Sequence, residues 1–450
     1  MARPKYSQNS MNPKSKALSK NLYRFTMIIL VTTICLLGCR QNNSAGDKTE
    51  VTAFVGANII DGTGAETIKG GVLLVEQGKI IGIGTKESIT VPAGASIVEV
   101  NGKTIIPGII DAHCHVGLAN GLQTGYSGEN VVKHLNTYAR YGITTLVSLG
   151  DGTEISAELR NKQNVPTLNR SRLFIAGEVI SGDTKGDVRE IIDHNDSLKV
   201  DFMKIRVDDV LGTSPKMTED IYKAVIEYSH ELGYRVASHI FYLEDAKNVL
   251  RAGTDYIAHS VRDTLVDEEF ITLMKENKVY YSPTLMREVS TFVFGGEPDY
   301  FTDPFFTKEV NAATIAELRN PERMESIAKS ASAQAYKAAL PTAMKNLKRL
   351  SDAGVTIVMG TDSGPAGRFP GYFEHLEMEM MVDAGMSPME VIMASTANTA
   401  KVMKLEGVGS LEQGKWADFI VLDKNPLEDI SNTRTISSVW IAGNKVSDKK

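Results

Sequence analysis

Two patterns of hydrophobic positions divide the chain. Residues 51–100 carry short apolar runs separated by glycine-containing turns, and the tail repeats this pattern at 416–423 and 438–446. Runs of this length bounded by turn residues predict β-strands that follow one another closely. A few strands can bury their apolar faces only against a partner. We therefore expect the end segments 51–106 and 403–450 to pair into one small composite β-sandwich domain.

The middle of the chain, residues 107–402, alternates short buried-strand runs with helical stretches. This alternation predicts parallel βα units, and eight units over this length predict an α/β fold with a TIM-like (β/α)8 barrel. A doubly wound sheet is the alternative, but no glycine-rich phosphate loop follows the first strand. The eight predicted strands are 108–113, 144–149, 172–176, 202–207, 235–239, 256–259, 279–283 and 356–360.

The first 39 residues have the pattern of a secretion signal. Basic residues precede the apolar run 25–37, which is shorter than the roughly 20 residues needed to span a bilayer core. The run leads into Leu36-Leu37-Gly38-Cys39, which resembles the lipobox of bacterial lipoproteins, where the cysteine is lipidated. We expect residues 1–39 to be a lipoprotein signal peptide with the lipid on Cys39, followed by a polar tether at 40–50. An uncleaved signal anchor is the alternative.

The cysteines agree with an exported protein that has no disulfide framework. Cys35 lies in the signal and Cys39 would carry the lipid, so that Cys114 remains alone in the mature chain. Arg40 stands where an Asp is associated with inner-membrane retention. We therefore expect a membrane-anchored lipoprotein of the bacterial cell envelope, held at the outer membrane.

Composition narrows the class of partner. The chain is 42% hydrophobic and 23% charged, as expected of a globular protein, and its formal net charge is only -6. No block of Lys and Arg occurs in the predicted folded part, which argues against nucleic-acid binding. Chemistry on a small-molecule substrate is the better expectation, and assembly into a homo-oligomer stays open.

The candidate chemistry begins with His113 and His115 at the end of the first predicted barrel strand. Side chains on a strand alternate between faces, so both imidazoles point the same way and Cys114 points to the opposite face. Two histidines separated by one residue, taken in isolation, are more often polar residues on the surface. Here, however, four of the eight histidines fall at predicted strand ends, where a barrel gathers its functional groups. His, carboxylate and a modified lysine suit zinc-like divalent ions; the strand-end residues are His113, His115, Lys204, His239, His259 and Asp362.

These strand ends carry a family resemblance that covers nearly everything after the tether. The chain resembles the amidohydrolase superfamily, within the group that includes imidazolonepropionase-like proteins and metal-dependent Xaa-Pro dipeptidases. The resemblance implies that His113, His115 and Asp362 hold a first metal ion, that His239 and His259 hold a second, and that a carboxylated Lys204 bridges them. The runs that carry it are 107–115, 202–205, 238–239, 257–260, 359–364 and 409–418.

Lys204 has two interpretations. Its neighbours Phe202, Met203 and Ile205 are apolar, and a charged lysine is costly to bury among them. Burial lowers the pKa of the amine, and the neutral amine can react with carbon dioxide to become an anionic ligand. The alternative is an outward-facing lysine, because Arg206 two positions later shares its face.

The predicted reaction is metal-assisted hydrolysis of an amide C–N bond, in a dipeptide or an N-acyl amino acid, with Asp362 as both ligand and proton shuttle. Two divalent ions, with zinc favoured, would be the cofactors. Tyr242, Arg262 and Arg287 follow later strands and could reach a substrate carboxylate, although such residues are more often on the surface. The aromatic-rich segment 291–320 is a candidate lid, and its aromatic side chains could equally pack on the barrel rim; the two roles are compatible.

Two other functions stay open. One is a cyclic amidine or amide hydrolase, or a deaminase, of the imidazolonepropionase type. Deaminase-type relatives place a catalytic Glu three residues after the fifth-strand histidine, where this chain has Tyr242, which disfavours deamination. The other is a lipid-tethered binding protein that keeps the barrel without catalysis, and the complete ligand set argues against it.

Overall fold

The computed structural model describes residues 50–447. The predicted signal peptide, the lipidation site Cys39 and residues 40–49 of the tether lie outside the described residues. In the part of the chain that is described, no helix combines the length and apolar character needed to cross a membrane.

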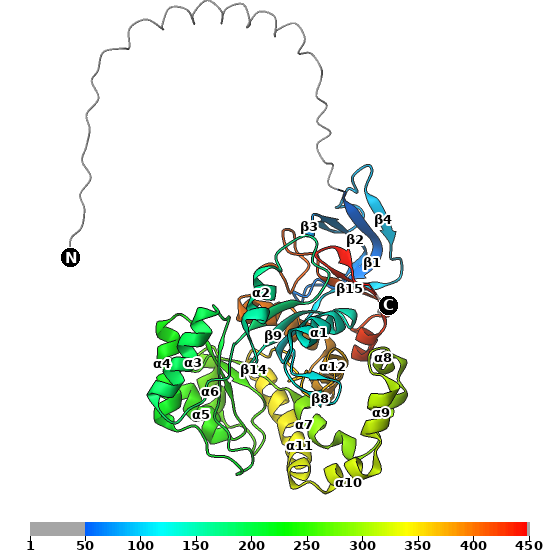
Figure 1. Cartoon of the computed structure of the whole chain (residues 1–450). Helices are drawn as coiled ribbons and strands as arrows, with labels where there is room; N and C mark the ends of the chain where they lie inside the picture. The colour runs from blue at the N-terminus through cyan, green and yellow to red at the C-terminus, as the bar shows by residue number, and fades with distance from the viewer. Residues whose placement is uncertain (1–49, 448–450) are drawn as a thin grey trace, which may run out of the picture. The chain divides into compact units, whose positions relative to one another are not determined.

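Strands from both ends of the chain form one eight-stranded sheet, visible as the blue and red strands of Figure 1. The central pairing is between β5 (Thr104–Pro107) and β15 (Phe419–Leu422), which run antiparallel with Ile106 opposite Ile420. The two predicted end segments therefore do pair. The other members are β1 (Thr52–Ile59), β2 (Ile68–Glu76), β3 (Lys79–Gly84), β4 (Ser96–Glu99), β16 (Ile436–Ile441) and β17 (Asn444–Lys445), in the order β17-β16-β15-β5-β1-β2-β3 with β4 beside β1.

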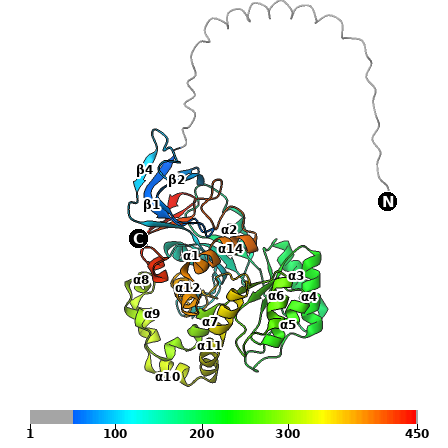
Figure 2. The ribbon, with the colours of Figure 1, turned by 180° about the vertical axis from the view of Figure 1, so that it is seen from behind.

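Between these segments lie seven parallel strands in two sheets, which alternate with helices as predicted. Figure 2 shows the green helices of this middle part grouped together. One sheet has the order β10-β9-β6 and the other β11-β12-β13-β14. The strands are β6 (Ile109–Cys114), β9 (Ile143–Ser148), β10 (Arg172–Ile175), β11 (Met203–Arg206), β12 (Val236–His239), β13 (Tyr256–Ala258) and β14 (Tyr280–Ser282). The helices beside them are α1 (Gly128–Arg140), α2 (Glu154–Asn161), α3 (Lys185–Ser197), α4 (Glu219–Glu231), α5 (Leu243–Arg251), α6 (Glu268–Glu276), α11 (Ala331–Asp352), α12 (Tyr372–Asp383), α13 (Pro388–Ala394) and α14 (Ala397–Met403).

The predicted eighth strand, 356–360, is not a regular strand. Ile357 forms a single parallel bridge with Tyr281, and Ser363 forms another with Cys114. The two sheets meet at one further bridge, Ile180 with Ile205. Among residues 50–447 no regular ladder closes the seven strands into a barrel, because the segment after α11 pairs through isolated bridges and backbone hydrogen bonds such as Ala112 N to Met359 O (2.9 Å).

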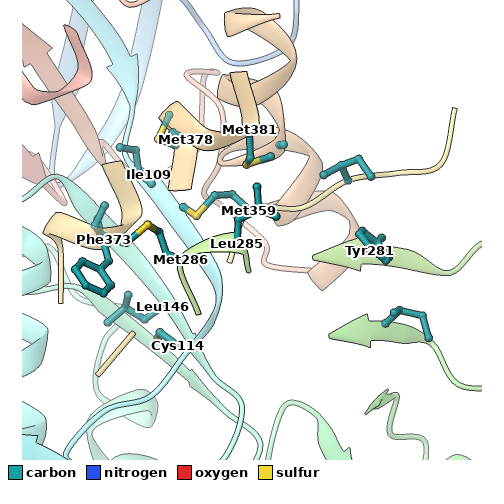
Figure 3. Close-up of a cluster of buried hydrophobic side chains, with 14 of the residues drawn as sticks. Ile109, Cys114, Leu146, Tyr281, Leu285, Met286, Met359, Phe373, Met378 and Met381 are labelled. Atoms are coloured by element: carbon teal, nitrogen blue, oxygen red, sulfur yellow. The ribbon is translucent and has the colours of Figure 1, made fainter. Parts of the chain in front are cut away.

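The strands are buried on both faces, which explains their nearly continuous apolar runs. One face contributes to a cluster that includes Ile110, Val147 and Phe202. The other face packs against helices, and Figure 3 shows Met378 and Met381 of α12 in this second cluster. It also includes Ile109, Cys114, Leu146, Tyr281, Leu285, Met286, Met359 and Phe373.

The aromatic segment after β14 forms short helices whose rings pack on one another and on Phe369. Phe294 lies 6.2 Å and Phe306 5.1 Å from the Phe369 ring, both edge-on. This is the predicted rim packing, and it fixes the loop that carries Phe369. The elements are α7 (Leu285–Phe292), η1 (Val293–Gly295), η2 (Asp299–Thr302), α8 (Pro304–Thr307), α9 (Ala312–Leu318) and α10 (Pro321–Lys329); a small hairpin, β7 (Ala119–Asn120) and β8 (Gln123–Thr124), and the short η3 (Ile430–Arg434) complete the fold.

Candidate metal centre

A cavity of about 370 Å³ brings together all six strand-end residues identified from the sequence. His115 Nε2 lies 2.9 Å from Asp362 Oδ1, and His113 Nε2 lies 3.9 Å from the same oxygen. The ring of His259 lies 4.5 Å from that of His113 and 4.1 Å from that of His239, centroid to centroid. Residues separated by as many as 249 positions along the chain therefore share one buried site; the six are His113, His115, Lys204, His239, His259 and Asp362.

A bulge in β6 aims the first two imidazoles into the cavity. Ile110 and Ala112 pack in the inner apolar cluster, whereas Cys114 packs in the outer one. The pairing of β6 with β9 is irregular between Asp111 and Cys114, and the His113 amide donates to Asp111 Oδ1 (2.8 Å). A bulge inserts an extra residue and changes which face the next side chains occupy. The two histidines therefore line the cavity and Cys114 lies on the opposite face of the strand, as predicted. The bulge that produces this arrangement is not visible in the sequence pattern.

The loop that carries Asp362 lies directly on the end of β6. The amides of Thr361 and Asp362 both donate to the His113 carbonyl oxygen (3.1 and 2.6 Å), and Asp362 has a φ of +59°. Gly364, at φ +108°, is required here, since an added Cβ would lie 1.9 Å from the His115 carbonyl oxygen. Left-handed backbone at a non-glycine residue is costly and collects at functional sites; His259 is a second example, with φ +94°.

Three of the four histidines have one ring nitrogen bonded to a residue outside the cavity lining, whereas His113 Nδ1 has no hydrogen-bond partner. His115 Nδ1 lies 2.5 Å from Asp151 Oδ2, and His239 Nε2 lies 2.8 Å from Asp208 Oδ2. His259 Nδ1 lies 2.8 Å from the Thr284 hydroxyl. Such partners fix ring orientation and tautomer in metal sites. Asp151 and Asp208 were missed from the sequence, although each follows a predicted strand by two positions or fewer.

Lys204 is buried, and its Nζ has no hydrogen-bond partner. Burial lowers the pKa of this amine to about 7. The outward-facing alternative is thereby excluded, since Lys204 lines the cavity and Arg206, 44% exposed, pairs with Asp208. An unpaired buried donor is costly unless a further group satisfies it.

The donor set fits a divalent cation. His113, His115 and Asp362 offer ligand atoms that all lie within 4.8 Å of one another. Burial lowers the pKa values of His113, His239 and His259, which favours the neutral imidazole that a metal ion requires. Burial opposes charge on His115 as well, but its bonds to Asp151 and Asp362 raise its pKa to about 9, so a cation there would replace a proton.

Beneath the Asp362 loop lies a buried acid pair. Thr361 Oγ1 lies 2.6 Å from Asp111 Oδ2 and 2.8 Å from Glu374 Oε1, and its hydroxyl donates to one of these two oxygens. The Ser363 hydroxyl also forms a hydrogen bond with Glu374. Burial raises the pKa values of both carboxyl groups, and their proximity raises that of Asp111 further. Two carboxylates this close share a proton, and the shared network holds the loop in place.

The structure brings one of the three predicted substrate residues to the cavity. Arg287 lines it, with a side chain 9% exposed. Arg262 does not: its side chain is fully buried and pairs with Glu288 at 3.0 Å, which corrects the prediction. Tyr242 is not among the lining residues either, because its hydroxyl donates to Asp209 Oδ1 (2.9 Å). Arg368, which was not predicted, lines the cavity instead.

The chain is similar in sequence to curated proteins over part of its length. Ochratoxinase of Aspergillus niger is 27% identical over 227 residues, which is 49% of this chain and 40% of that protein. An uncharacterised protein of Mycobacterium tuberculosis is 27% identical over 205 residues, 43% of this chain and 54% of its own. The chain thus spans about half the length of these curated relatives.

Solved structures share the fold. A Xaa-Pro dipeptidase with bound methionine in its active site superposes with a TM-score of 0.71 at 24% identity, over 88% of this chain and 99% of that one. The sequence profile of the Amidohydrolase family matches residues 104–446, which contain every strand-end residue of the cavity. The resemblance stated from the motifs is confirmed, and this chain belongs to the Amidohydrolase family.

Proposed function

We propose that this chain is a metal-dependent hydrolase that cleaves an amide C–N bond in a small molecule such as a dipeptide or an N-acyl amino acid. One observation carries the proposal: four histidines, a buried lysine and a buried aspartate from five segments of the chain converge on one cavity. Family membership and the ochratoxinase and dipeptidase relatives support the same reaction class. We also propose that the seven strands and the bridging segment at Ile357 act as a (β/α)8 barrel, with the site at the C-terminal strand ends.

Two metal ions, zinc by preference, fit the donors. His113, His115 and Asp362 would hold one ion, and His239 and His259 would hold the other. Lys204 would bridge them after its neutral amine adds carbon dioxide to give a carbamate and release one proton. The unpaired, buried Nζ supports this step. Bound metal would supply Lewis-acid polarisation of the substrate carbonyl and would lower the pKa of the attacking water.

Asp362 is suited to move the proton. One of its oxygens, Oδ1, faces the imidazoles of His113 and His115, while Oδ2 points away toward Arg368. The carboxylate can accept a proton from the attacking water and deliver it to the leaving nitrogen. The buried acid pair under the loop keeps this side chain in place.

Metal analysis combined with turnover tests the proposal. Purified protein loaded with zinc is assayed on a panel of dipeptides and N-acyl amino acids, before and after a chelator. We expect about two ions per chain and hydrolysis that the chelator abolishes and zinc restores. Metal-loaded protein that hydrolyses no member of the panel would contradict the proposal and favour the non-catalytic binding protein.

Asp362→Asn separates catalysis from folding, and Asp423→Asn, at an exposed residue far along the chain, is the matched control. We expect Asp362→Asn to lower kcat by about 100-fold or more, as loss of a general base does. The control should keep full turnover. Normal turnover in Asp362→Asn would remove the assigned proton transfer.

A further inference from the structure

Two arginines meet at the outer oxygen of Asp362. Arg368 Nη1 lies 2.5 Å and Arg287 Nε 4.0 Å from Asp362 Oδ2. The inner oxygen, Oδ1, faces the imidazoles instead. Both guanidinium groups line the cavity, so they border the space that a substrate would enter.

Arg287 is nine-tenths buried and only partly paired. Its Nη1 reaches Glu288 (3.2 Å) and its Nη2 donates to the Tyr336 hydroxyl (3.1 Å), but Nε has no hydrogen-bond partner. Glu288 also pairs with the buried Arg262, so one carboxylate serves two guanidinium groups. A buried donor without a partner points to a ligand that supplies one.

Arg368 has a backbone held by hydrogen bonds and a side chain that is partly exposed. Its carbonyl oxygen accepts from the Gly364 amide (2.9 Å), and the neighbouring Phe369 is buried among the aromatic rings of the α7–α10 segment. The Arg368 side chain is 21% exposed, and the only carboxylate that it contacts among the described residues is that of Asp362.

The charges of the cavity are unbalanced. Among its lining residues in the described chain, Asp362 is the one carboxylate, against three arginines. Arg206 is balanced by Asp208 outside the lining, and Arg287 shares Glu288. Bound divalent ions would add positive charge. An anionic substrate group is therefore favoured in this space, and a guanidinium pair matches the two oxygens of a carboxylate.

We propose that Arg368 and Arg287 together form the site for a carboxylate of the substrate, and that this carboxylate replaces Asp362 as the ion-pair partner of Arg368 when substrate binds. This inference rests on the proposed hydrolase function and specifies its substrate class: amides that carry a carboxylate beside the scissile bond. In the structure Asp362 Oδ2 contacts Arg368 and lies near Arg287.

The test compares N-acetyl-L-amino acids with their carboxamides, which differ only in the proposed anchor. Wild-type, Arg368→Gln, Arg368→Lys and Arg287→Lys proteins are assayed, with Arg189→Gln on the exposed face of α3 as the matched control. We expect the wild type to prefer the carboxylate by about 100-fold or more in kcat/KM. Arg368→Gln should lose roughly 10- to 100-fold on the carboxylate, mainly through KM, and change less than about 3-fold on the carboxamide.

Two results would overturn the inference. Equal losses on both substrates would show that Arg368 acts only on Asp362, and an equal wild-type rate on both would show that no anion site exists. Arg368→Lys should recover part of the carboxylate preference, because it keeps the charge and loses the paired donors.

Binding separates this inference from the hydrolase proposal. If zinc-loaded wild type hydrolyses nothing, calorimetric titration with N-acetyl-L-phenylalanine and its carboxamide still reports on the site. Tighter binding of the carboxylate in wild type, lost in Arg368→Gln, would support the anion site while the hydrolase proposal fails. Equal binding of the two compounds would contradict the anion site as well.

Discussion

The buried ion pair between Arg172 and Asp418 is expected to contribute strongly to stability. Arg172 Nε and Nη2 donate to the two oxygens of Asp418 (2.6 and 3.2 Å), and the Ala442 amide donates to Asp418 Oδ1 (2.7 Å). The side chains are 2% and 3% exposed. Asp418 closes the 409–418 motif, so the pair ties that motif and the end sheet to β10.

The magnitude follows from burial. Two hydrogen bonds between charged groups contribute roughly 1.5–3 kcal/mol each, and removing one partner of a buried pair leaves an uncompensated charge that costs about 3–5 kcal/mol. We expect Asp418→Asn to lower the free energy of unfolding by about 3–5 kcal/mol. Asp423→Asn breaks an ion pair with Lys103 in which the side chains are 33% and 57% exposed, and it should cost less than about 1 kcal/mol.

Tryptophan fluorescence during urea unfolding provides the assay. The chain has two tryptophans. The Trp416 ring lies 4.6 Å from the Arg172 guanidinium, and the Trp440 ring stacks 5.9 Å from that of Phe419, so both report on this region. The reasoning is refuted if Asp418→Asn costs no more than Asp423→Asn. Replacing both charged partners by apolar residues, Arg172→Met with Asp418→Leu, should be less destabilising than Asp418→Leu alone.

Three further predictions concern the metal bridge, a pH-dependent pair and the N-terminus. Lys204→Ala should reduce bound zinc from about two ions to one per chain and lower kcat by about 100-fold or more; two ions with full turnover would contradict the bridge. The hydrogen bond that His230 Nε2 donates to Asp255 (2.9 Å) raises the pKa of His230. The pair therefore stabilises the fold below the unfolded-state pKa of about 6.5, and this stabilisation is lost as pH rises through the folded-state value. His230→Gln should therefore lower the urea midpoint at pH 6 and have little effect at pH 9, whereas an equal loss at both pH values would be inconsistent. Labelled fatty acid should be incorporated into wild-type protein and not into Cys39→Ser, and equal labelling would remove the proposed lipid anchor at the cell envelope.

Much of the candidate site was predictable because its residues lie at the ends of strands that the sequence pattern indicates clearly. His239 and Lys204 lie two positions after buried inner-face residues, Ala237 and Phe202, so strand alternation alone places them on the cavity side. The eighth segment was harder. Its apolar run at 356–360 predicts a strand, but the chain there pairs through isolated bridges and then turns at Asp362.

The residues that the sequence did not reveal act through space. Asp151 and Asp208 resemble ordinary loop residues until the fold sets them against His115 and His239. Arg262 and Arg287 could not be distinguished by spacing, because both follow a strand by a few residues. Their positions differ because the Arg262 side chain is buried in an ion pair with Glu288, whereas Arg287 lines the cavity.

The sequence by itself determined what depends on local period: the strand and helix alternation, the end segments with strand character, and the pair of histidines on one face of a strand. Only the tertiary structure decided which polar groups meet, because those contacts join residues far apart in the chain, as Asp362 meets His115. It also decided the left-handed backbone at His259 and Asp362, because His and Asp adopt positive φ more often than most residues but still uncommonly. Such a conformation persists only because packing and hydrogen bonds around it outweigh its cost.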